Sequence, residues 1–303
     1  MTEIEIYDTG AKVQIPSSWE EMTASQVLYA FRIYSDCIGR GGSPLEFQIL
    51  MLHHFLGISR PSASRLFWAR IPEMEERICE NTAMLCDRCM SFLLDVDDKS
   101  LQCSLSFDSV ENPLPRVRMK RRLTYLYGPA SLLQDLTFGE FRHASIALQT
   151  FLRTAKESDL NECIAFLYRR KSRHPNRAGR YVPDIDNGNM EAAAKDASRL
   201  EPWQKNIIIL WFASCLKYLQ SGTVDIDGES VELSRLFASG DGATLGGYSF
   251  GWSDLAVQIA KDNVVGSIER VDEEPLFSIL SIMWHNFKEQ KQYEAISKAR
   301  KTK

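Results

Sequence analysis

Residues 136–171 read LTFGEFRHASIALQTFLRTAKESDLNECIAFLYRRK, and this stretch sets the fold class of the 303-residue chain. Thr137 and Glu140 stand three residues apart, as in a capping box, where each side chain bonds the other residue's backbone N–H. Apolar residues then recur at helical spacing. Ser158 is a candidate N-cap for a second helix over 158–170. The stretch therefore predicts two consecutive helices.

The same helix-start signals recur along the chain, with two short hairpins among them. Thr23 and Gln26 form a second capping box, and Ser43 followed by Pro44 opens a helix that Gly57 is placed to end. Apolar periodicity predicts helices at 24–38, 44–57, 72–94, from 137 onward, and at 158–170, 201–220, 252–262 and 273–298. Alternating residues predict hairpins at 4–15 and 224–233, with a short strand at 101–107 and a glycine-rich connector over 239–251. The sequence predicts a mainly α protein with an N-terminal hairpin and a second small hairpin.

The composition is that of an ordinary globular protein, with 44% hydrophobic residues, 25% charged residues and a formal net charge of −4. We expect an N-terminal hairpin and helical region over 1–118 and a helical region over 119–303, with a single domain as the alternative. The most apolar stretch, 207–216, has about half the length of a membrane span. No secretory signal is recognisable, so we expect a cytoplasmic protein or one packaged into a larger particle.

No group of residues has the spacing of a catalytic or cofactor site. Cys86 and Cys89, in CDRC, look like half a zinc site. Their helical spacing from Cys79, however, favours buried thiols on one helix face over a metal knuckle. His53 and His54 fall within a helix and favour core or boundary positions. We expect no enzyme activity and no cofactor, with a zinc or thiol enzyme as the remotest alternative.

Two basic runs remain, RVRMKRR at 116–122 and the one that begins at Arg169. Such runs bind nucleic acid by counterion release, and Tyr125 and Tyr127 nearby can stack on bases. The competing interpretation is a solvated face or a protein contact. On that view the first arginines of the second run follow a helix C-terminus, whose dipole favours cations, and an exposed loop comes next. The sequence favours this second interpretation. The nucleic-acid alternative requires both basic runs to lie on one face of the protein. Its candidate residues are 169–180 together with Arg116, Arg118, Lys120, Arg121 and Arg122.

Several short motifs resemble tail-assembly chaperone-like and tail accessory proteins of bacteriophages and prophages. They are IPSSWEEMTASQ at 15–26, LTFGEF at 136–141, IAFLYR at 164–169, the apolar helix around Trp211 and the helical unit that opens at Trp252. The resemblance covers residues 3–35 and roughly 120–290. Arg170 stands where that group usually has proline, which keeps the basic run unbroken.

The resemblance implies a non-enzymatic protein that binds a phage tail structural protein of the tube or tape-measure type. It implies a location in the bacterial host cytoplasm or within the virion. Nucleic acid is the second candidate partner, and no membrane contact is expected. The predicted contact surface is segment 137–183 with helix 203–219, and its candidate residues are Phe141, Tyr168, Arg169, Arg170, Lys171, Arg173, Arg177, Arg180 and Trp211.

Overall fold

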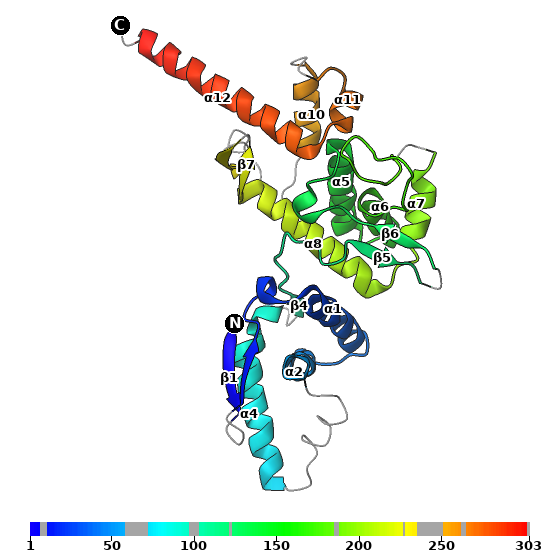
Figure 1. The fold of residues 1–303 in the computed structure, drawn as a ribbon, viewed down its shortest axis with the longest axis vertical. Helices are drawn as coiled ribbons and strands as arrows, with labels where there is room; N and C mark the ends of the chain where they lie inside the picture. Colours follow the sequence, from blue (N-terminus) through cyan, green and yellow to red (C-terminus); the bar gives the residue numbers. More distant parts are fainter. Residues whose placement is uncertain are drawn as a thin grey trace. The chain divides into compact units, whose positions relative to one another are not determined.

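The computed structural model describes residues 1–6, 11–57, 72–96, 103–120, 123–184, 188–226, 228–234, 251–261 and 265–301. Within these ranges helices dominate and the strands pair in two-stranded antiparallel sheets, which confirms the mainly α fold class (Figure 1). The chain forms two units, Met1–Ser109 with Pro202–Trp211 and Val110–Glu201 with Phe212–Lys303. The sequence placed a division between residues 118 and 119, whereas the first unit ends at Ser109 and is completed by part of a later helix.

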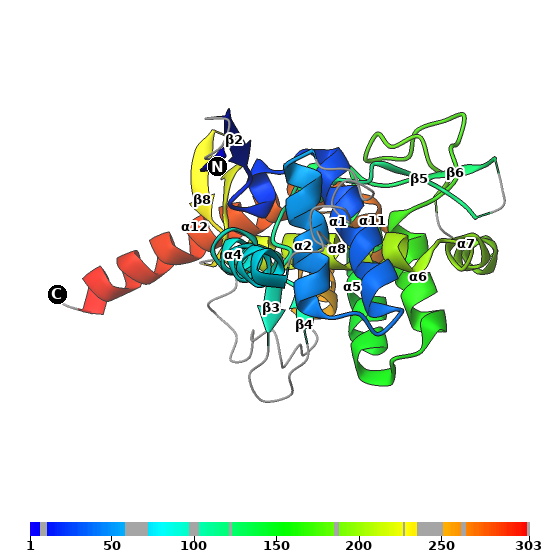
Figure 2. The same ribbon diagram turned by 90° about the horizontal axis from the view of Figure 1, so that it is seen from below.

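The first unit begins with the predicted hairpin. Its elements are β1 (Thr2–Ile6), β2 (Ala11–Ile15), η1 (Trp19–Glu21), α1 (Ala24–Ile38), α2 (Pro44–Phe55), α4 (Pro72–Met90), η2 (Ser91–Leu93), β3 (Leu94–Val96) and β4 (Cys103–Leu105). The strands pair as β1–β2 and β3–β4. Helix α2 packs against both α1 and α4 (Figures 1 and 2).

Local capping chemistry explains where α1 begins. The Thr23 backbone N–H donates to Gln26 Oε1 at 2.8 Å, and Gln26 N–H donates to Thr23 Oγ1 at 3.3 Å. The predicted capping box is therefore confirmed. The core beside this helix is aromatic, because Trp19 lies 5.9 Å from Phe31 and 5.1 Å from Phe107 between ring centroids.

Helix α2 also begins and ends as its sequence predicts. Ser43 accepts a hydrogen bond from the Glu46 N–H at 3.1 Å, and Pro44 is the first helical residue. The helix ends at Phe55, and Gly57 has a φ of 68°, the left-handed conformation that glycine adopts without strain.

The second unit holds the remaining elements and shares one helix with the first. These are β5 (Arg116–Arg118), β6 (Tyr125–Tyr127), η3 (Ser131–Leu133), α5 (Phe138–Thr154), α6 (Glu157–Leu167), α7 (Met190–Ala197), α8 (Pro202–Ser221), β7 (Thr223–Ile226), β8 (Glu229–Glu232), α10 (Gly251–Lys261), α11 (Ile268–Glu273) and α12 (Leu276–Lys301). Strands β7 and β8 form the predicted second hairpin. The division between the units falls within α8.

Helices α5 and α6 form the centre of the second unit. They pack against each other, and Ala155, with a φ of 53°, makes the turn between them. Phe141 on α5 lies 4.7 Å from Trp252 on α10 and 6.3 Å from Phe212 on α8, between ring centroids. One aromatic residue thus joins three helices.

Several predicted boundaries were wrong. Helix α6 is capped at Lys156 rather than Ser158, and it ends at Leu167, three residues before the predicted end at 170. The helix predicted over 273–298 is α12, which begins three residues later at Leu276, and α11 before it was not predicted. Pro275 follows α11 and, because it lacks a backbone N–H, does not continue that helix. The sequence analysis missed α7 and the β5–β6 hairpin.

The cysteine prediction holds where the structure describes it. Cys86 and Cys89 are buried on α4, and burial raises the pKa of the Cys86 thiol to about 11. Outside the described residues lie the side chain of Cys79, the first hairpin turn at 7–10, Asp227 of the second turn and nearly all of the connector. No helix within the described ranges combines the length and apolarity that crossing a membrane requires.

Candidate functional site

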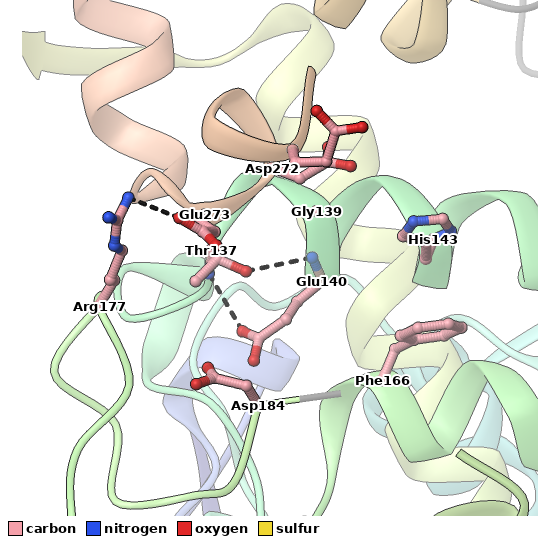
Figure 3. Close-up of a pocket in the computed structure, with 10 residues that line it drawn as sticks. Thr137, Gly139, Glu140, His143, Phe166, Arg177, Asp184, Asp272 and Glu273 are labelled. Carbon is pink, nitrogen blue, oxygen red and sulfur yellow. Dashed lines mark hydrogen bonds and ion pairs between the residues drawn. The ribbon is translucent and has the colours of Figure 1, made fainter. Parts of the chain in front are cut away.

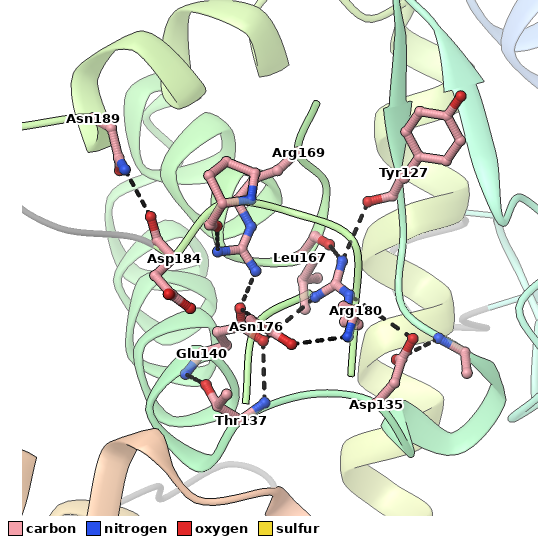
Figure 4. A network of polar contacts seen from close by, with 12 residues as sticks. Tyr127, Asp135, Thr137, Glu140, Leu167, Arg169, Asn176, Arg180, Asp184 and Asn189 are labelled. Atoms are coloured by element: carbon pink, nitrogen blue, oxygen red, sulfur yellow. Dashed lines mark hydrogen bonds and ion pairs between the residues drawn. The ribbon is translucent and has the colours of Figure 1, made fainter. Parts of the chain in front are cut away.

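A buried charge network lies at the start of α5 (Figure 4). Glu140 forms ion pairs with Arg169 and Arg180, the latter at 3.4 Å. Both arginine side chains are almost completely buried, at 2% and 4% exposure. Asn176 Nδ2 donates to Glu140 Oε1 at 3.3 Å, and the Thr137 N–H donates to Oε2 at 3.1 Å. One carboxylate therefore caps α5 and pairs with two buried cations, and Asp135, 3.9 Å from Arg180 Nε, supplies a second negative charge.

The two arginines also bind the backbone around them. Arg180 Nη2 donates to the Leu167 carbonyl at 2.7 Å and to the Tyr127 carbonyl at 3.2 Å. Burial lowers the pKa of Arg180, and Glu140 opposes that shift. The carbonyl at the end of α6 is thus bonded by Arg180 from a distant loop, rather than by the arginines that directly follow the helix.

Five of the nine residues predicted to contact a partner lie in the interior. Tyr168 is fully buried, donates its hydroxyl to the Leu114 carbonyl at 3.0 Å, and has a pKa raised by burial. A Cβ on Gly128 would stand 2.4 Å from the Tyr168 ring, so this glycine permits the close approach. The five interior residues are Phe141, Tyr168, Arg169, Arg180 and Trp211.

The other four predicted contact residues reach solvent. Lys171 and Arg173 are exposed. Arg170 forms two hydrogen bonds with Asp196, at 2.5 and 2.7 Å, and Arg177 pairs with Glu273 at 2.8 Å.

A tight loop over 172–181 presents part of this basic run. The Ser172 N–H donates to the Tyr181 carbonyl at 2.8 Å, and the Asn176 N–H donates to the Arg180 carbonyl at 2.7 Å. Tyr181 itself is 56% exposed. The prediction of a wholly exposed loop was therefore wrong at Asn176 and Arg180, whose side chains turn inward to Glu140.

The two basic runs meet along β6. Strand β5 pairs with β6 so that Arg116 faces Tyr127 and Arg118 faces Tyr125, and an isolated bridge joins Tyr127 to Arg169. Arg116 lies 5.6 Å from the Tyr125 ring centroid. Lys120 pairs with Glu201 at 2.9 Å, and Arg121 and Arg122 lie outside the described residues. The first run therefore presents arginine and tyrosine together, while the adjoining Arg169 is buried and neutralised.

An acidic pocket of about 450 Å³ opens beside the N-terminus of α5 (Figure 3). His143 stacks on Phe166 with a centroid distance of 5.2 Å, and burial followed by the charge of Arg142 lowers the His143 pKa. The lining residues are Thr137, Gly139, Glu140, His143, Phe166, Arg177, Asp184, Glu269, Asp272 and Glu273. No three His, Cys, Asp or Glu side chains are placed to hold a metal ion within the part of the chain that the structure describes.

A second pocket, of about 370 Å³, lies between α7 and the segment that follows α6. Four cationic side chains and one carboxylate line it, beside apolar groups. The lining residues are Leu126, Tyr168, Arg169, Arg170, Pro183, Asn189, Ala192, Ala193, Lys195, Asp196 and Arg199. Of the residues predicted to contact a partner, Tyr168, Arg169 and Arg170 are brought together here.

Sequence reasoning missed the central role of Glu140 and that of Asp196. Glu140 was identified only as a helix cap, because the sequence gives no sign that two arginines about 30 and 40 residues later turn inward. Asp196 lies on the unpredicted α7. Comparison with protein-family models, curated proteins and solved structures finds no match for this chain.

Proposed function

We propose that this protein is a non-enzymatic tail-assembly protein of a bacteriophage or prophage, chaperone-like or accessory. It acts by contact with a tail structural protein of the tube or tape-measure type, in the host cytoplasm or within the particle. The resemblance of its capped helices and the LYR-containing segment to such proteins supports the phage assignment. The loop over 172–181 supports action by protein contact.

The observation that carries the proposal is an exposed loop with a rigid base. Arg173 and Tyr181 reach solvent, while Arg180 between them is anchored to Glu140. Tyrosine and arginine are enriched in the residues that dominate binding energy at protein interfaces. A loop that is already ordered loses less conformational entropy on binding. Its positive charge favours an acidic segment of the partner.

Co-purification from cells that also produce the candidate tail proteins tests the proposal. We expect the wild-type chain to retain a tube or tape-measure protein, and the double variant Arg173→Ala/Tyr181→Ala to retain about tenfold less. Lys156→Ala removes one exposed charge outside the loop and serves as the control. A wild-type chain that retains neither tail protein would contradict the proposal.

A second candidate function is nucleic-acid binding through the β5–β6 hairpin. It is favoured by the cross-strand placement of Arg116 and Arg118 opposite Tyr127 and Tyr125. Against it, Arg169 and Arg180 are buried and paired with Glu140, and the net charge of the chain is −4. If this function is present, affinity falls steeply between about 50 and 200 mM salt, and Arg116→Ala/Arg118→Ala reduces the salt dependence. A nucleic-acid affinity that does not change with salt, or no binding at low salt, would contradict this second function.

A further inference from the structure

We propose that the second pocket binds a carboxylate attached to a small apolar group. The pocket's volume of about 370 Å³ lies within the range of small-ligand sites. This inference uses the chemistry of the pocket alone and does not depend on the tail-assembly role.

The charge around the pocket favours a single negative charge. Asp196 is already shared between Arg170, at 2.5 and 2.7 Å, and Arg199, at 2.8 Å. Lys195 adds a third positive charge from α7. Arg170, Lys195 and Arg199 therefore line the pocket with one carboxylate, which leaves positive charge in excess, while Asp196 still disfavours a doubly charged ligand.

Arg169 also lines the pocket, although its charge is already paired with Glu140. Its Nη1 donates to the Pro183 carbonyl at 2.7 Å and its Nη2 pairs with Glu140, while its Nε–H is buried without an acceptor. A buried donor with no acceptor is costly, and a charge-assisted hydrogen bond is among the strongest that can satisfy one. Arg169 therefore keeps one unsatisfied donor in the protein interior beside the pocket, while the excess positive charge comes from Arg170, Lys195 and Arg199.

The rest of the lining selects an apolar body for the ligand. Leu126, Tyr168 and Pro183 contribute apolar lining, and α7 adds Ala192 and Ala193. The two alanines leave space that a longer side chain would fill. A short aliphatic chain can bury its surface there while its carboxylate meets the cations.

Two sources carry this chemistry, a free aliphatic acid and the C-terminal carboxylate of a peptide. Titration calorimetry of the full chain distinguishes them with hexanoate and N-acetylleucine, each compared with its neutral amide. We expect at least one of the two carboxylates to bind. The corresponding amide should bind at least about tenfold more weakly. The acid that binds more tightly identifies the source. The inference is overturned if neither carboxylate binds, or if the amides bind equally well.

Variants then place the ligand in this pocket. Ala193→Leu fills the space with a residue that a helix accepts, and we expect it to abolish binding. Lys195→Gln removes one exposed cation. We expect it to weaken binding of the carboxylate several-fold and to leave binding of the amide unchanged. Lys156→Gln makes the same charge change outside the pocket and leaves affinity unaltered. Unchanged affinity in Lys195→Gln, with the fold intact by circular dichroism, would place the ligand elsewhere and overturn the inference.

Discussion

Glu140 shows how much structure one side chain can hold. Its two oxygens accept from the Thr137 N–H and from Asn176, and they pair with two buried arginines. A buried ion pair contributes little net stability beside a hydrophobic replacement, but losing one partner leaves an uncompensated charge. At this position two guanidinium groups would lose that partner, and Arg180 would keep only Asp135, 3.9 Å from its Nε.

Replacing Glu140 by glutamine is therefore expected to cost about 3–5 kcal/mol of unfolding free energy, because the buried Arg169 loses its paired carboxylate and Arg180 keeps only Asp135. Chemical denaturation measures the change. Lys12→Ala, which breaks the exposed 2.8 Å pair with Glu3, is the control and is expected to cost less than about 1 kcal/mol. Similar costs for the two variants would show that the buried network is not needed for the fold.

The stability of the protein is also expected to depend on His143. Burial and the nearby Arg142 lower its pKa below the ordinary value of 6.5, so the unfolded chain binds its proton more readily. The free energy of unfolding should therefore fall as pH drops below about 6.5. His143→Gln removes this contribution and should give a shallower pH dependence. His53 and His54, whose pKa values burial also lowers, account for part of the remaining slope. An unchanged slope in the variant would contradict the assignment.

Among the elements, the contact between α5 and α11 depends on a glycine. A Cβ on Gly139 would lie 2.7 Å from the Asp272 Cβ and 2.9 Å from its carbonyl oxygen. Asp272 in turn accepts from Arg142 Nε at 3.0 Å. The absence of a side chain at Gly139 therefore lets α11 lie against α5 and complete the acidic pocket.

Gly139→Ala tests this contact with two opposing effects. Alanine favours a helix by about 1 kcal/mol over glycine, whereas overpacking costs about 1–3 kcal/mol. We expect net destabilisation and faster amide exchange in α11. Adding Asp272→Gly removes the colliding Cβ and should restore part of the packing. A stabilised Gly139→Ala protein with unchanged exchange would show that α11 can move at no cost.

Helix starts were the elements that the sequence predicted best, because a cap is a local interaction. Thr23–Gln26 and Thr137–Glu140 each form the expected pair of bonds within four residues. The predicted end of α6 was wrong because apolar residues continue to Tyr168. The Tyr168 side chain is buried, but its backbone is extended and not helical. The β5–β6 hairpin has three-residue strands, too short for alternation to distinguish them from a basic run. The inward turn of Arg169 and Arg180 depends on tertiary contacts and has no local signal.

At the scale of the whole molecule, α8 belongs to both units. Pro202–Trp211 belongs to the first and Phe212–Ser221 to the second, although the helix is continuous. The chain therefore leaves the first unit at Ser109 and returns to it at Pro202. Neither unit is a single uninterrupted segment of sequence.

A proline within α8 is expected to disturb both units. Ala213→Pro removes a helical hydrogen bond and costs about 3 kcal/mol or more. Hydrogen exchange should then quicken both in α1 of the first unit and in α5 of the second. The control is Ala194→Pro in α7, which lies wholly in the second unit and should leave exchange in α1 unchanged. Exchange in α1 that is insensitive to Ala213→Pro would show that the first unit does not depend on the continuity of α8.

The order in which a ribosome releases the chain gives this interruption a consequence. Met1–Ser109 emerges first, yet the segment that completes its unit follows the whole of Val110–Glu201. Domains usually fold as units during synthesis, starting from the N-terminus. Here the unit that contains Met1–Ser109 is complete only when Trp211 has left the exit tunnel. Nascent chains halted before Pro202 should therefore be the ones that cellular chaperones hold longest.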